Sequence, residues 1–90
     1  MNTRVLPNDV EAEKAVLGSM IFGKDAIAIS CEILKSDDFY RADHKIIFES
    51  MVELFSNNIH VDLVTLNNVL SDKGKLDAVK NIINNNILRM

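Results

Sequence analysis

The first half of the chain places apolar residues at helical spacing. A first helix is predicted from Asn8 to Gly23, with apolar side chains four positions apart at Ala12, Val16 and Met20. Asn8, followed three residues later by a glutamate, has the sequence of a capping box, and further acidic residues favour a helix start here. Gly23 is expected to end the helix.

A second helix is predicted from Asp25, its expected N-cap, to about Lys35. Its apolar residues form two adjacent stripes, which indicates a helix buried over much of its circumference. The two stripes are Ala26, Ile29 and Ile33, and Ile27, Cys31 and Leu34. The polar residues 36–38 then predict a turn, in which the paired aspartates Asp37 and Asp38 act as caps.

A third helix is predicted from about Arg41 to Ser56, and the asparagines that follow suit a left-handed helix end. One side of it is apolar or aromatic, and we expect this side to face the core. Its members are His44, Phe48, Met51, Val52 and Phe55, with Ile47 and Leu54 beside them.

The last third of the chain predicts two shorter helices. Asp62 is expected to cap a helix that Gly74 closes, with Leu66 among its core residues. A final segment, 77–88, carries apolar residues at helical spacing among asparagines, which are poor helix formers. Together these elements predict an all-α domain, a compact and irregularly packed bundle of four to five short helices.

Composition narrows the class of protein. Ninety residues make one small domain, and 48% hydrophobic with 26% charged residues is globular usage. We see neither a membrane-length apolar stretch nor a secretory signal, and the single cysteine precludes an internal disulfide, which fits a cytoplasmic location. The net charge of −3 argues against direct nucleic-acid binding, which usually needs a basic surplus.

Two patterns could carry chemistry, and each has a simpler structural interpretation. Gly18 and Gly23 have phosphate-loop spacing, but an aspartate stands where a magnesium-binding hydroxyl is needed. His44, His60 and Cys31 are too scattered for a zinc site. We therefore interpret His44 as a core residue, His60 as a solvated loop residue and Cys31 as a buried apolar residue. No catalytic residue, cofactor or metal is predicted.

The order of short blocks resembles the N-terminal domain of bacterial replicative DNA helicases of the DnaB type. The blocks are Leu6-Pro7, residues 10–18, 38–40, 44–48 and 61–66, and Gly74 with Leu76. They span about residues 5–79 of a single 1–90 domain. The resemblance implies a non-catalytic helical domain, which forms part of the collar of a hexameric ring and lies on the side where primase docks. It places ATP hydrolysis in a separate RecA-like domain, which we expect this chain to lack, as a truncated member of the family would.

The resemblance weakens over residues 80–90. Lys80 and Asn81 stand where the family usually has a glycine pair that leads into a helical hairpin. The apolar residues of the C-terminal segment are our candidate partner surface, because a domain this small offers little to cover them. They are Val79, Ile82, Ile83, Ile87 and Leu88. The alternative is that the segment folds back as the fifth helix of the core. The expected partners are other copies of the chain or of a replicative helicase, and the primase C-terminal domain.

Two other functions stay open at this stage. One is a small helix-turn-helix regulator, although the predicted recognition helix offers Asn67 and Asn68 and no arginine. The other is a stand-alone mimic or inhibitor that inserts into the helicase collar, whose residues would look the same as those of a genuine collar domain.

Overall fold

The computed structural model describes residues 9–23 and 25–81. These residues form five α-helices and a short 3₁₀ turn, with no strand in this part of the chain, so the all-α prediction is confirmed. In chain order the elements are α1 (Val10–Phe22), α2 (Ala26–Ile33), η1 (Ser36–Asp38), α3 (Ala42–Ser56), α4 (Leu63–Asp72) and α5 (Leu76–Asn81).

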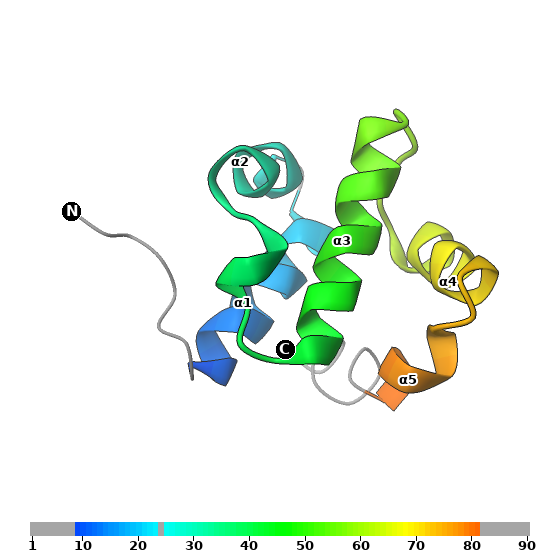
Figure 1. Ribbon diagram of the computed structural model, residues 1–90. Coiled ribbons are helices and arrows are strands. Elements are labelled where there is room, and N and C mark those ends of the chain that lie inside the picture. Colours follow the sequence, from blue (N-terminus) through cyan, green and yellow to red (C-terminus); the bar gives the residue numbers. More distant parts are fainter. Residues whose placement is uncertain (1–8, 24, 82–90) are drawn as a thin grey trace.

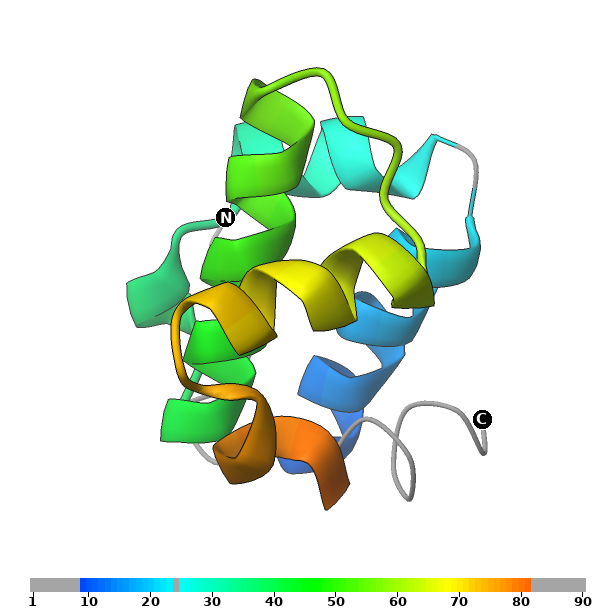
Figure 2. The same ribbon diagram turned by 90° about the vertical axis from the view of Figure 1, so that its right-hand side faces the viewer.

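The central element is α3, which packs against α1, α2, α4, α5 and η1 (Figure 1). Seen from the side, α4 crosses α3 and α5 lies across its lower end (Figure 2). The buried apolar residues form one cluster around α3. They are Leu17, Met20, Ile21, Ile27, Phe39, Ile47, Phe48, Met51, Leu54, Val61, Leu66, Leu70 and Val79.

The first helix begins one residue later than predicted. Asp9 is its N-cap, and Asp9 Oδ1 accepts a hydrogen bond from the N–H of Ala12 at 3.1 Å, while Asn8 lies outside the described residues. Gly23 is the C-cap as expected, and its N–H donates to the carbonyl of Ser19 at 2.7 Å. A Cβ at Gly23 would lie 2.6 Å from that carbonyl oxygen, so the approach requires glycine.

The prediction that both apolar stripes of α2 are buried is wrong. Ile27 is buried, but Ile29 and Ile33 are 54% and 63% exposed. Cys31 and Leu34 pack against the core beside Ile27. Because α2 packs mainly against α1 and α3, only the stripe that faces them is covered, and the other stripe stays at the surface.

The third helix confirms most of its predicted core face and corrects one residue. His44, Ile47, Phe48, Met51 and Leu54 are all buried, and Phe48 stacks against Phe39 with ring centroids 4.9 Å apart. Phe55, by contrast, is 40% exposed. It lies on the same face as Phe48 and Met51, but it stands in the last turn of α3, where the neighbouring helices no longer cover that face.

Two helices end in the same way, each with a residue in the left-handed conformation. After α3 this residue is Asn58, with φ of 60°, and after α4 it is Gly74, with φ of 70°. In both cases the next N–H reaches back to a carbonyl of the last turn, from Ile59 to Leu54 at 2.9 Å and from Lys75 to Leu70 at 2.8 Å. Both predicted helix ends are confirmed.

Carboxylates hold the N-terminal ends of α3 and α4. Asp62 Oδ1 accepts from the N–H of Thr65 at 2.9 Å, and Thr65 Oγ1 accepts from the N–H of Asp62 at 3.0 Å, so the predicted cap is confirmed. Asp43, in the first turn of α3, accepts two hydrogen bonds from the Arg41 guanidinium, at 2.9 and 2.7 Å.

A buried glutamate joins α1 to the start of α3. Glu13 is fully buried, and its carboxylate accepts from the N–H groups of Tyr40 at 2.6 Å and Arg41 at 3.4 Å. His44 Nδ1 lies 2.8 Å from Glu13 Oε1, which fixes the ring, while His44 Nε2 is buried with no hydrogen-bond partner among residues 9–23 and 25–81. From the sequence, Glu13 counted only among the acidic residues that favour the start of the first helix.

The structure also corrects the candidate partner surface at Val79. This side chain is fully buried, because α5 folds back against α3 and α4 and Val79 completes the core between them. It therefore cannot belong to an exposed surface in this fold. Ile82, Ile83, Ile87 and Leu88 lie outside the described residues.

Replacing Glu13 should destabilise the fold strongly. In Glu13→Ala the N–H groups of Tyr40 and Arg41 and the imidazole of His44 lose their buried acceptor, and we expect a loss of about 3 kcal/mol or more. Urea denaturation followed by circular dichroism measures it. Glu11→Ala is the matched control, because Glu11 is 83% exposed and pairs with Lys14 on the helix surface. The control should change stability by less than about 0.5 kcal/mol, and equal losses in both variants would contradict the assigned role.

Gly74→Ala tests the left-handed helix end. A methyl group at Gly74 would meet nothing within 4 Å, so any loss comes from the backbone conformation alone. We expect a loss of about 1 kcal/mol, or roughly 4–8 °C in melting temperature. Gly74→Asn should lose less, because asparagine already holds this conformation at position 58. An alanine variant as stable as wild type would rule out this constraint.

Acid should weaken the fold through Asp43 and Asp62. Hydrogen bonds from Arg41 lower the pKa of Asp43, and the backbone hydrogen bond from Thr65 lowers the pKa of Asp62. Each pKa is thus below the unfolded value of about 3.9. Their stabilising contributions are complete above that pH and are lost as the pH falls through the folded-state pKa.

Urea denaturation between about pH 2 and pH 6 should therefore show a loss of stability below about pH 4. Asp62→Asn should reduce this loss, because an amide accepts the same hydrogen bond without titrating. Asp37→Asn, which changes an exposed side chain of η1, is the control. Identical acid profiles for Asp62→Asn and wild type would contradict the assignment.

Candidate interaction surface

The glycine pair with phosphate-loop spacing does not form a loop. Gly18 is buried inside α1, and Gly23 is the C-cap of the same helix, so the residues between them are helical. Their N–H groups are used within the helix and cannot curl around a phosphate. Lys24, the lysine of the apparent motif, lies outside the described residues.

The titratable residues singled out from the sequence do not converge. His44 is buried against Glu13, as expected of a core residue, and His60 is 86% exposed in the loop before α4. Cys31 is half-buried, and burial raises the pKa of its thiol, which makes it a weak nucleophile at neutral pH. In residues 9–23 and 25–81 no group of three or more histidine, cysteine, aspartate or glutamate side chains could hold a metal.

The paired aspartates of η1 have a structural role, as predicted. Asp38 Oδ2 accepts a hydrogen bond from the N–H of Lys35 at 2.9 Å, which closes the 3₁₀ turn that leads into Phe39. Asp37 is exposed on the same turn. Among the helices that the structure describes, none combines the length and apolar character needed to cross a bilayer.

What the surface does offer is apolar area. Several large apolar side chains are exposed, and they are spread over α1, α2, the ends of α3 and α4. They are Phe22, Ile29, Ile33, Tyr40, Phe55, Ile59 and Val64. Single exposed apolar residues are ordinary on a protein surface, so the informative places are those where the surface is also concave.

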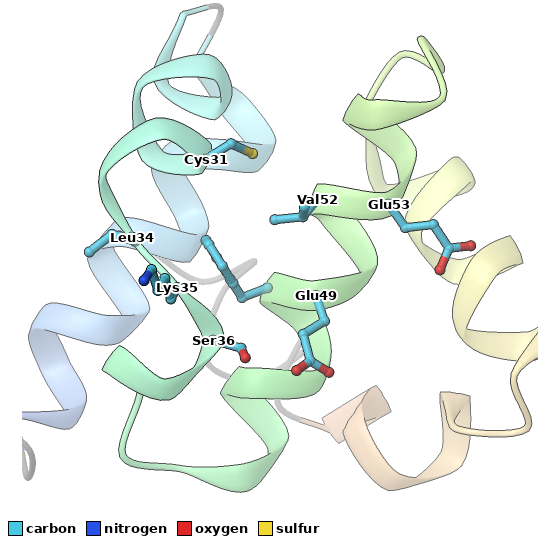
Figure 3. A pocket seen from close by; sticks show the side chains of 8 residues that line it. Cys31, Leu34, Lys35, Ser36, Glu49, Val52 and Glu53 are labelled. Carbon is cyan, nitrogen blue, oxygen red and sulfur yellow. The ribbon is translucent and has the colours of Figure 1, made fainter.

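One such place lies between α2 and α3, and we call it the α2–α3 groove (Figure 3). Its volume is about 410 Å³. Four of its lining residues are apolar or nearly so and four are polar or charged. They are Cys31, Leu34, Phe48 and Val52, and Lys35, Ser36, Glu49 and Glu53.

A second hollow of about 350 Å³ lies where the loop after α3 passes the start of α2. Ile27, Phe55 and Ile59 are the apolar residues of its lining. Phe55 was assigned to the core from the sequence, and its actual place here could not be found from periodicity. A helical pattern gives the face of a helix but not how far its neighbours extend along it.

The arrangement of α4 does not favour a DNA-reading helix. Asn67 and Asn68 are exposed on it, as the helix-turn-helix hypothesis requires. Lys73, the basic residue at its end, forms an ion pair with Glu53 of α3 at 2.7 Å. Neutralised in this way, Lys73 contributes little to phosphate binding.

Comparison with known proteins gives the family directly. The family model described as the DnaB-like helicase N terminal domain matches residues 5–87. The replicative DNA helicase DnaC of Bacillus subtilis is 38% identical over 82 residues, which are 91% of this chain and 18% of that protein. The replicative DNA helicase DnaB of Rhodothermus marinus is 41% identical over 80 residues, 89% of this chain and 8% of that protein.

A solved structure agrees with the sequence comparison. The crystal structure of the N-terminal domain of DnaB helicase from Mycobacterium tuberculosis superposes with a TM-score of 0.77 at 37% identity, covering 81% of this chain and 52% of that one. This chain spans less than a fifth of the length of the helicases named above. With the family model matched over most of its length, the chain belongs to the DnaB-like helicase N-terminal domain family.

Proposed function

We propose that this chain is a non-catalytic protein-interaction domain of a replicative DNA helicase. It would take part in DNA replication in the cytoplasm, through contacts with other helicase subunits and with the primase C-terminal domain. The observation that carries the proposal is the match to the helicase N-terminal domain over residues 5–87. ATP hydrolysis and unwinding would then belong to parts of a helicase outside this domain.

The use of side chains within the fold supports an interaction role. Residues of the family-like blocks stabilise the scaffold: Glu13 and His44 are paired inside it, Asp62 caps α4 and Gly74 ends it. The exposed apolar side chains and the concave surfaces beside α2 and α3 are not needed for these tasks. A surface of this kind suits helix-to-helix contacts between proteins.

Self-association and primase binding are the two tests. We expect the weight-average sedimentation coefficient of the chain to rise with concentration, because contacts between copies are what a collar domain supplies. We also expect isothermal titration calorimetry to detect binding of the primase C-terminal domain. Primase that lacks this domain is the control. A chain that is monomeric at every concentration and gives no binding heat with the primase C-terminal domain would refute the proposal.

A further inference from the structure

The α2–α3 groove is a preformed feature of the core edge. Its floor includes Phe48, which is 3% exposed and held by its contact with Phe39. Above the floor, Val52 of α3 and Cys31 of α2 point toward each other across the opening (Figure 3). Since Phe48 is fixed by core packing, an apolar group that enters the groove meets a rigid surface and little ordering entropy is lost on the protein side.

Some charged side chains of the groove lining already form an ion pair and others do not. Both carboxylates of the lining, Glu49 and Glu53, come from α3, and the one lysine, Lys35, follows α2. Glu53 is already paired with Lys73 at 2.7 Å. Glu49 and Lys35 are both exposed, and neither forms an ion pair within the described residues, so the α3 side of the groove presents a negative charge beside apolar surface and the α2 side a positive one.

This combination selects among possible occupants. Nucleic acid is disfavoured, because the two glutamates of the lining outnumber its one lysine. A second copy is disfavoured as the occupant. A two-fold contact would set one concave surface against another, and two copies that each carry a net charge of −3 would repel each other. A convex apolar ridge with a basic side chain at its edge fits both the shape and the charge. An amphipathic helix provides such a ridge from residues three and four positions apart.

We propose that the α2–α3 groove binds an amphipathic helix of a partner protein, with apolar side chains between Cys31 and Val52 and a lysine or arginine paired with Glu49. The inference rests on the proposed function, because it specifies where and by what chemistry the interaction domain would take a partner. The volume of about 410 Å³ is within the range of about 300–1,000 Å³ typical of clefts that enclose ligand groups.

Cys31 allows a direct test, because it is the only cysteine of the chain and lines the groove. The probe is a synthetic helical peptide of about four turns with leucines on one face and lysines at the edges of that face. Its counterpart carries glutamates in place of the lysines. The leucine–lysine peptide should slow the reaction of Cys31 with Ellman's reagent by at least about fivefold, because it covers the thiol. The leucine–glutamate peptide should not.

Substitutions then locate the contact. Val52→Asp should weaken peptide binding more than about tenfold, because it places a charge in the apolar lining. Glu49→Lys should weaken it about fivefold, since the rim ion pair becomes a repulsion. Val64→Asp is the matched control, because Val64 is 68% exposed on α4 and outside the groove. Circular dichroism checks that each variant keeps its helices.

Three results would overturn the inference. They are an unprotected Cys31 with the leucine–lysine peptide, equal protection in Val52→Asp and wild type, and protection that grows with chain concentration in the absence of peptide. The last would identify a second copy as the occupant. If wild-type chain binds neither primase nor helicase but the peptide protects Cys31, the proposed function fails and the groove assignment stands. If primase and helicase subunits bind Val52→Asp as tightly as they bind wild type, and the peptide leaves Cys31 of the wild-type chain unprotected, only the groove assignment fails.

Discussion

The burial of the Glu13 carboxylate is the interaction on which the rest of this fold depends. A carboxylate taken out of water is strongly unfavourable unless donors surround it. Here the N–H groups of Tyr40 and Arg41 and the ring of His44 supply them, and all three come from the chain around the start of α3. One side chain of α1 thus fixes where the central helix begins and how it is rotated.

From that fixed start, α3 sets the positions of the other elements. Its buried residues face α1 and α4, Phe48 meets Phe39 before the helix, and α5 closes the lower end through Val79. The capping carboxylates Asp9 and Asp62 and the left-handed residues Asn58 and Gly74 fix ends of α1, α3 and α4. In a domain of this size stability is marginal, so these local devices are a substantial part of the total.

The same packing decides which apolar surface stays available. With α2 covered by α1 and α3 on one side only, the stripe of Ile29 and Ile33 stays exposed. The seam between α2 and α3 is not filled to the surface either, and leaves a groove with Glu49 at its rim. In this DnaB-like helicase N-terminal domain, apolar side chains therefore remain exposed beside the buried residues that hold the scaffold.

The sequence by itself determined the helices and most of their ends. Apolar spacing, Asp62 followed by Thr65, and Asn58 and Gly74 act within one or two turns of chain, so their effects can be read locally. Only the tertiary structure decided that Glu13 is buried, that Phe55 is exposed and that Val79 lies in the core. Each of these depends on which distant helix covers the residue. Periodicity gives the face of a helix, but the cover comes from contacts between segments far apart in sequence.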